Sequence, residues 1–158
     1  MSKVPTILIV DDDAAHRSML RTVLRGWGFA TEEADDGDAA VERVRERAFD
    51  AILSDVRMAR VDGIAALREI LKLNPAIPVL IMTAWSSVET AVEAMRIGAY
   101  DYLPKPLDFD VLRLTLNRAL EHTRLAEENR ELRSLMDMQG PAGILGRSAR
   151  MQELVKML

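Results

Sequence analysis

The stretch Thr6-Ile-Leu-Ile-Val10-Asp11-Asp12-Asp13 decides the fold of this chain. A short apolar run rich in β-branched residues is followed at once by three carboxylates. Apolar runs without polar alternation are typical of strands that are buried on both faces, as in a parallel sheet. The three acids therefore predict that this strand ends at a polar edge of such a sheet.

The same pattern recurs along the chain, with helical periodicity between the repeats. Apolar stretches predict strands at residues 6–10, 29–34, 51–53, 78–82 and 100–103. Five strands alternating with five helices imply parallel crossovers. We expect an α/β fold: a flavodoxin-like, doubly wound, five-stranded parallel sheet of order 2-1-3-4-5, in which the fifth helix extends into a linker helix.

Glycines and an aspartate predict two of the helix ends. Gly26 and Gly28 close the first helix, and Asp108 is a suitable N-cap for the fifth. Apolar residues spaced by three or four predict the buried helix faces. The buried face of the fourth helix is predicted to consist of Val88, Ala91, Val92 and Met95. That of the fifth helix is predicted to consist of Val111, Leu112, Thr115, Leu116 and Ala119.

Two residue types on these helices are predicted to be structural. Met19 and Met95 are interpreted as core filler. His16 and His122 are interpreted as exposed helix residues, because their neighbours do not supply the spacing of a metal site.

Composition narrows the classes of function. The chain has 158 residues, a net charge of −4 and no cysteine. Disulfides and thiolate chemistry are thereby excluded, and nothing resembles the basic footprint of a nucleic-acid binder. Its apolar runs are too short to span a bilayer. We expect a soluble cytoplasmic protein that makes no direct contact with nucleic acid or membrane.

Polar residues follow four of the predicted strands. Asp11 and Asp12 follow the first, and the third, fourth and fifth are followed by Asp55, Thr83 and Lys105. In an open α/β sheet, ligands bind beyond the carboxyl ends of the strands where strand order reverses. Three carboxylates that converge there must take up protons or bind a cation, and hard oxygen ligands favour Mg²⁺.

Asp55 is the best candidate for a nucleophile. A carboxylate beside Mg²⁺ can attack a phosphoryl group to form an acyl phosphate. Lys105 can neutralise a phosphoryl oxygen, and Thr83 offers a hydroxyl. Lys105 precedes Pro106, and X-Pro bonds are the ones that adopt the cis form. Asp13 is interpreted as a helix N-cap only.

These motifs together resemble response-regulator receiver domains. The resemblance rests on Ile-Leu-Ile-Val-Asp11-Asp12, on Ser54-Asp55-Val56-Arg57-Met58 with Asp62-Gly63, on Met82-Thr83-Ala84 and on Tyr102-Leu103-Pro104-Lys105-Pro106. It covers about residues 4–121. Such domains usually carry Pro shortly after the Met that follows the phosphoacceptor, whereas this sequence has Ala59.

The resemblance implies a role for each matching residue. It implies that Asp55 accepts a phosphoryl group from a cognate sensor histidine kinase. Mg²⁺ would be held by Asp12, Asp55 and the backbone carbonyl of Arg57, with Asp11 acting through a water. Thr83 and Ala84 would bind the phosphoryl group while Tyr102 turns inward. These changes would remodel the face of the fourth helix, fifth strand and fifth helix, through which a homodimer would form.

The predicted fifth helix continues beyond the receiver-like region of residues 1–121. Over residues 122–138 an apolar stripe with alternating spacings of four and three is formed by Leu125, Asn129, Leu132 and Met136. Such a heptad stripe predicts a parallel coiled coil in which Asn fixes the register. A solvated extension of the helix is the alternative interpretation.

Residues 139–158 carry a second resemblance. Gly143-Ile144-Leu145-Gly146-Arg147-Ser148, followed by Met151-Gln152-Glu153, looks like the entry to the central AAA+ ATPase domain of NtrC-type, sigma-54-dependent activators. No G-x-x-x-x-G-K-[ST] loop occurs in the sequence. We therefore expect a truncated regulatory fragment that is not an enzyme, with the ATPase domain downstream in the parent protein.

Two other functions fit part of the pattern. Asp11-x-Asp13, Thr83 and Lys105 follow the motif order of haloacid-dehalogenase-type phosphatases, with Asp11 as nucleophile. That interpretation leaves Asp55 without a role. A degenerate receiver that serves only for dimerisation would not need converging acids and a lysine. The identity of the phosphorylated aspartate discriminates the receiver from the phosphatase.

Overall fold

The computed structural model describes residues 4–55, 63–83 and 88–138. In these residues five strands alternate with five helices. The strands are β1 (Thr6–Val10), β2 (Ala30–Ala34), β3 (Ala51–Asp55), β4 (Val79–Thr83) and β5 (Asp101–Pro104). The helices are α1 (Ala14–Gly26), α2 (Gly37–Glu46), α3 (Gly63–Leu73), α4 (Val88–Ile97) and α5 (Phe109–Met138).

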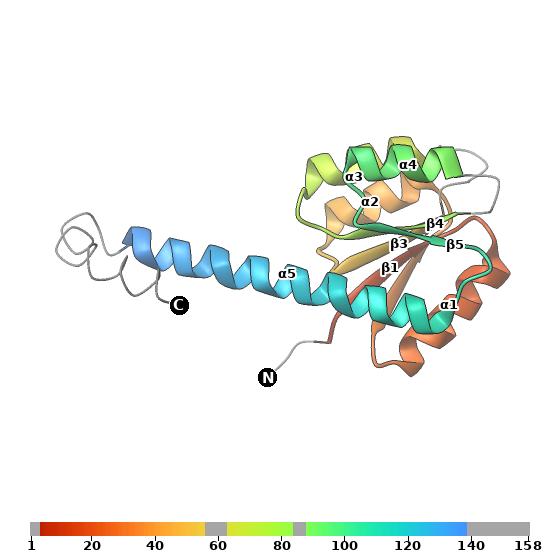
Figure 1. Cartoon of the computed structure of the whole chain (residues 1–158), viewed down its shortest axis with the longest axis horizontal. Coiled ribbons are helices and arrows are strands. Elements are labelled where there is room, and N and C mark those ends of the chain that lie inside the picture. The colour runs from red at the N-terminus through yellow and green to blue at the C-terminus, as the bar shows by residue number, and fades with distance from the viewer. Residues whose placement is uncertain (1–3, 56–62, 84–87, 139–158) are drawn as a thin grey trace. The chain divides into compact units, whose positions relative to one another are not determined.

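All strand pairs are parallel, and the sheet order is β2-β1-β3-β4-β5. Figure 1 shows α2, α3 and α4 on one face of the sheet, with α1 and the first part of α5 on the other. This arrangement confirms the predicted flavodoxin-like order 2-1-3-4-5. Among the described helices, none combines the length and apolar character needed to cross a membrane.

Two apolar clusters fill the space between the sheet and its helices. Leu8 and Val10 of β1 pack in the cluster under α2, α3 and α4, whereas Ile7 and Ile9 pack in the cluster under α1 and α5. Side chains of a strand alternate between its faces, and here both faces are covered. Continuous apolar runs, rather than alternating ones, are the consequence.

The helix caps follow the sequence prediction. Asp13 is the N-cap of α1, and its carboxylate accepts hydrogen bonds from the backbone N–H groups of Ala15 and His16. Asp108 accepts from the N–H groups of Asp110 and Val111 at the start of α5. Gly28, just beyond α1, has a φ of 95°, a left-handed conformation that side chains with a Cβ disfavour. The predicted caps are thus confirmed.

Some of the predicted helix faces are wrong in detail. Val92 is 47% exposed and Met95 37%, whereas Ala91 and Ala94 of α4 are buried. Small side chains let α4 lie close to its neighbours, so its inward face is centred on alanines that a pattern of large residues overlooks. On α5, Val111 is 45% exposed while the rest of the predicted face is buried. Met19 does pack against the core, as expected.

The chain divides into two compact units, Met1–Thr123 and Arg124–Leu158. Helix α5 contributes to both units. Its first part buries Leu112, Leu116 and Ala119 completely, whereas Leu125, Leu132 and Leu135 of its second part are all more than half exposed. The second part of α5 therefore carries apolar side chains that the described residues do not cover.

Candidate functional site

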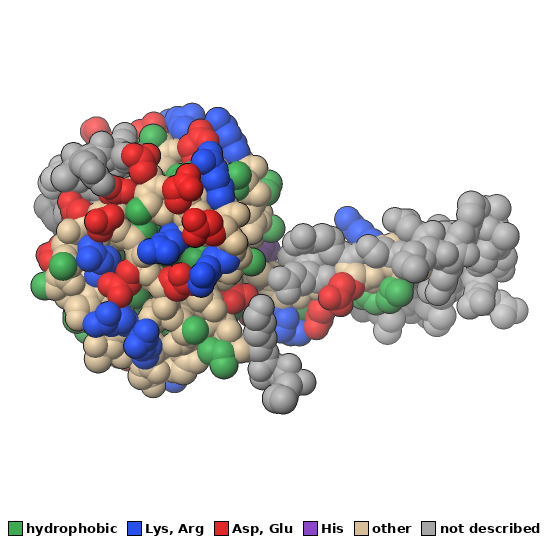
Figure 2. All heavy atoms as spheres, turned by 180° about the vertical axis from the view of Figure 1, so that it is seen from behind, with side chains coloured by type: hydrophobic (Ala, Val, Ile, Leu, Met, Phe, Trp, Pro, Cys, Tyr) green, Lys and Arg blue, Asp and Glu red, His purple; other side chains and the backbone are tan. Residues whose placement is uncertain are grey.

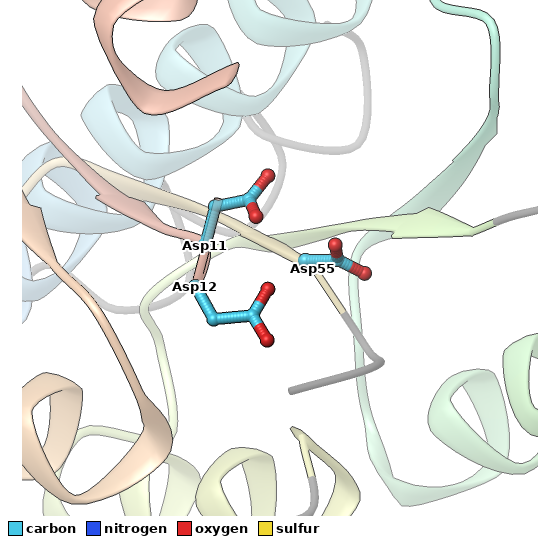
Figure 3. Close-up of side chains that lie close together, drawn as sticks. All are labelled: Asp11, Asp12 and Asp55. Atoms are coloured by element: carbon cyan, nitrogen blue, oxygen red, sulfur yellow. The ribbon is translucent and has the colours of Figure 1, made fainter. Parts of the chain in front are cut away.

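Two strand ends meet where the order of the sheet reverses. Strand β1 lies between β2 and β3, and its register pairs Val10 with Ser54. The next residues along these parallel strands are Asp11 and Asp55. Figure 3 shows their side chains close together with that of Asp12, at the carboxyl edge of the sheet.

The three aspartates form a compact group of oxygen donors. One carboxylate oxygen from each of Asp11, Asp12 and Asp55 lies within 4.8 Å of the others. Asp11 is fully buried, Asp55 is 7% exposed and Asp12 is exposed. Carboxylates this close repel one another, and a divalent cation offsets the repulsion. A set made only of hard oxygen donors suits Mg²⁺ better than a metal that prefers nitrogen or sulfur.

Lys105 is the positive group beside this cluster. Its Nζ donates a hydrogen bond of 2.8 Å to Asp55 Oδ2. The backbone supports this placement, because Lys105 N–H donates to the carbonyl of Thr83 at 2.8 Å. The Lys105–Pro106 peptide bond is cis. Lysine and aspartate are thus paired across two strand ends that are 50 residues apart in sequence.

Thr83 and Tyr102 occupy different environments on β4 and β5. Thr83 ends β4 and is 2% exposed. Tyr102 lies on the edge strand β5, opposite Ile81 of β4, and is 46% exposed. The expected inward turn of Tyr102 concerns the phosphorylated state and stays a prediction.

His16 joins the site, which the sequence interpretation missed. Its ring Nδ1 contacts Asp11 Oδ2, and its side chain is 20% exposed. The interpretation of His16 as a plain exposed helix residue is therefore wrong. Asp13 caps α1 and so fixes where the first turn begins, which brings the third helical residue back over Asp11. His122 is exposed and contacts the ring of Tyr100.

Several predicted site residues lie outside the described part of the chain or can be described only in part. Arg57, with its backbone carbonyl, and Ala84 fall outside it, as do residues 139–158. On the linker stripe, Leu125, Asn129 and Leu132 are exposed; Met136 lies within α5, where only its backbone is described.

The charged side chains on one face of the molecule are mixed in sign. Figure 2 shows acidic and basic residues interspersed on that face. Several of the charged side chains on the protein surface form ion pairs: Arg47 with Glu32, Arg68 with Glu93, and Lys72 with Glu69. Exposed pairs of this kind contribute about 0–1 kcal/mol each, whereas the Asp55–Lys105 pair is part-buried and adjoins the acidic cluster.

Comparisons with known proteins point to one family. The family described as the response regulator receiver domain matches residues 7–117. The transcriptional regulatory protein ZraR of Escherichia coli K12 is 54% identical over 155 residues, an overlap of 94% of this chain and 33% of that protein. The chain thus spans about a third of the length of the curated relatives it matches.

Solved structures agree with this match. NtrX from Brucella abortus superposes with a TM-score of 0.76 at 37% identity, covering 82% of this chain and 30% of that one. A response regulator receiver domain protein from Clostridium thermocellum gives a TM-score of 0.75 at 27% identity, covering 78% of this chain and 99% of that one. The second match covers nearly the whole of the solved chain.

Proposed function

This chain belongs to the response regulator receiver domain family, and on that premise we propose that it is a switch driven by phosphorylation of Asp55. The observation that carries the proposal is the convergence of three carboxylates within 4.8 Å, with Lys105 bound to one of them. The family match also favours this function over a phosphatase that uses Asp11, because Asp55 and Lys105 then both have roles.

The residues present fit a bound Mg²⁺. Asp12 and Asp55 would be direct ligands together with the backbone carbonyl of Arg57, and Asp11 would act through a water. When bound, Mg²⁺ supplies positive charge that offsets the repulsion between the carboxylates and an incoming phosphoryl group. Asp12 is exposed while Asp11 and Asp55 are buried, so the pocket is open to solvent on the Asp12 side.

Asp55 would take up the phosphoryl group by direct attack. One of its carboxylate oxygens forms a bond to phosphorus while the bond from phosphorus to the donor's leaving atom breaks, and the leaving group departs with that electron pair. The donor would be the phosphohistidine of a sensor histidine kinase, whose leaving atom is an imidazole nitrogen. Lys105 already reaches Asp55 and would neutralise a phosphoryl oxygen.

The signal would leave the site through Thr83. Its hydroxyl and the backbone of Ala84 would bind the phosphoryl group, and Tyr102 would turn inward. The three elements α4, β5 and α5 carry exposed apolar side chains, some of which such a change could rearrange: Val92, Met95, Tyr102, Phe109, Val111 and Leu114. We propose that a homodimer forms on the face made by these three elements.

The second part of α5 would carry the signal onward. Leu125 and Leu132 are exposed within the heptad stripe, and exposed apolar side chains at this spacing can pack against a second copy of the helix. In the parent protein, a downstream AAA+ ATPase domain acting with sigma-54 would receive the signal. The proposed setting is the cytoplasm, without direct contact of this chain with nucleic acid.

Site-specific phosphorylation tests the proposal. The wild-type chain is incubated with acetyl phosphate in the presence of Mg²⁺ or EDTA, and the modified residue is located by mass spectrometry. We expect one phosphoryl group on Asp55, dependence on Mg²⁺, and no uptake by Asp55→Asn. Modification of Asp11 with Asp55 untouched would instead support the phosphatase. Dimerisation of a chain that takes up no phosphoryl group would support the purely structural receiver.

A further inference from the structure

The Asp11 carboxylate is held by two contacts from its own chain segment. Oδ1 accepts a hydrogen bond of 2.9 Å from the backbone N–H of Asp13. Oδ2 is in contact with Nδ1 of His16. A carboxylate that binds a cation is ionised and only accepts hydrogen bonds, so in that state Nδ1 of His16 is the donor. Each oxygen of Asp11 thus has a donor that fixes the direction of the carboxylate.

The backbone around Asp11 is held as well. The guanidinium of Arg17 donates to the Asp11 carbonyl at 2.6 Å, and Arg17 Nε pairs with Glu33 of β2 at 3.3 Å. The N–H of Asp11 donates to the carbonyl of Ala34 at 3.1 Å. These contacts fix the position of the Asp11 backbone independently of His16. The contribution specific to His16 is therefore the orientation of the side chain.

His16 acts on the pocket through Asp11. In the described part of the chain, the acidic group that could hold a cation contains Asp11, Asp12 and Asp55 but not His16. The imidazole touches the carboxylate that lies farthest from solvent, since Asp11 is fully buried. A partner of this kind orients a ligand without being one.

We propose that His16 is a positioning residue that sets the affinity of the pocket for its divalent cation by fixing the Asp11 carboxylate. This inference rests on the proposed function of the pocket. Loss of the N–H donor would leave the carboxylate held at Oδ1 by the Asp13 N–H but no longer held by His16 at Oδ2, so that it could turn away from the cation and its water. Removal of such second-layer partners costs about 10–100-fold in metal affinity. Because Asp11 would act through a water, we expect the lower end of that range.

Three variants isolate the effect. His16→Leu removes the donor while keeping an apolar side chain of similar bulk. His16→Asn keeps an amide N–H near the position of Nδ1 and serves as the conservative rescue. His122→Leu makes the same change on the exposed histidine of α5 and is the matched control.

Cation affinity is measured first without any phosphoryl donor, by following the amide signals of Asp13 and its neighbours in ¹H–¹⁵N NMR spectra during a Mg²⁺ titration. We expect the Kd for Mg²⁺ to rise about tenfold in His16→Leu, and to stay near wild type in His16→Asn and His122→Leu. The Asp13 amide reports directly on Asp11, because it donates to Oδ1. Its signal should shift in His16→Leu before Mg²⁺ is added.

Phosphorylation by acetyl phosphate gives a second measurement. The Mg²⁺ concentration for half-maximal rate should rise about tenfold in His16→Leu, with a much smaller change in the rate at saturating Mg²⁺. In an Asp11→Asn background the His16→Leu effect should vanish, since the two residues would act as one unit.

The outcomes separate the two proposals. The role of His16 would be overturned by an unchanged or lower Kd for Mg²⁺ in His16→Leu, or by an effect of His16→Leu on that Kd that persists in the Asp11→Asn background. Phosphorylation of the wild type on Asp55 would still support the switch in either case. A wild-type chain that took up no phosphoryl group on Asp55 would overturn both. If His16→Leu did not fold, a tighter or equal Kd for His16→Ala would be the overturning result.

Discussion

Lys105 Nζ lies 2.8 Å from Asp55 Oδ2, so the basic residue after β5 is bound to the acid that ends β3. This pair places one positive charge against the proposed acceptor. Replacing Lys105 with Met should lower the initial rate of phosphorylation by acetyl phosphate about 100-fold, the cost of removing one electrostatic donor from a transition state.

Two controls accompany this change. Lys105→Arg keeps the charge and should recover part of the rate, whereas Lys72→Met removes an exposed lysine that pairs only with Glu69 among its described contacts and should have no effect. A Lys105→Met rate within threefold of wild type would show that the pair is structural.

Binding of Mg²⁺ should stabilise the fold. A cation held at 100 times its Kd raises the free energy of unfolding by about 2.7 kcal/mol, or roughly 6–10 °C in Tm for a domain of this size. Thermal unfolding with Mg²⁺ or EDTA measures the difference. The rise in Tm with Mg²⁺ should be mostly lost in Asp12→Asn. Asp13→Asn keeps a capping side chain and should show the same rise in Tm with Mg²⁺ as the wild type. An equal loss of this rise in both variants would contradict a site built on Asp12.

Thr83 should couple phosphorylation to its output without being needed for uptake. Its side chain is buried at the end of β4, and the proposed hydroxyl contact forms only with the phosphoryl group. Thr83→Ala should still be phosphorylated on Asp55. The dissociation constant of its phosphorylated dimer, measured by sedimentation velocity, should be at least tenfold higher than that of the phosphorylated wild type. Thr83→Ser retains the hydroxyl and should dimerise. Normal dimerisation by Thr83→Ala would place the coupling elsewhere.

The first part of α5 should be needed for the stability of the domain. Leu112 is fully buried against the sheet, and truncating a buried leucine to alanine costs about 2–5 kcal/mol. Leu114, two residues away, is 51% exposed, so Leu114→Ala should change the free energy of unfolding by less than about 0.5 kcal/mol. Urea denaturation of the two variants measures the contrast. Similar losses would mean that the exposed face of α5 is covered in solution.

The linker stripe should govern association through the second part of α5. Leu132→Glu puts a charge on the stripe and should raise the dimer dissociation constant at least tenfold while leaving phosphorylation unchanged. Leu135→Glu makes the same change off the stripe on a side chain of similar exposure and should have a smaller effect. Analytical ultracentrifugation compares them; equal effects would favour a solvated helix over a coiled coil.

The architecture could be predicted because its signals are local. Residues 7–10, Ile-Leu-Ile-Val, form a continuous apolar run only because both faces of the sheet are covered. Acids and a lysine at successive strand ends must meet at one edge once the strands are parallel. The helix faces were harder to predict. Val92 and Met95 are large and apolar yet exposed, while Ala94 is buried, because the close approach of two elements selects small residues.

The sequence by itself determined the sheet, its order, the caps of α1 and α5 and the identity of the strand-end residues, since these follow from periodicity and from residues next to one another in the chain. Only the tertiary structure decided that Lys105 binds Asp55 and that His16 bends back onto Asp11. The first contact joins residues 50 positions apart. The second depends on where the Asp13 cap starts the helix. The first distance is set by how separate strands pack, and the second by the direction in which the turn after β1 leads into α1.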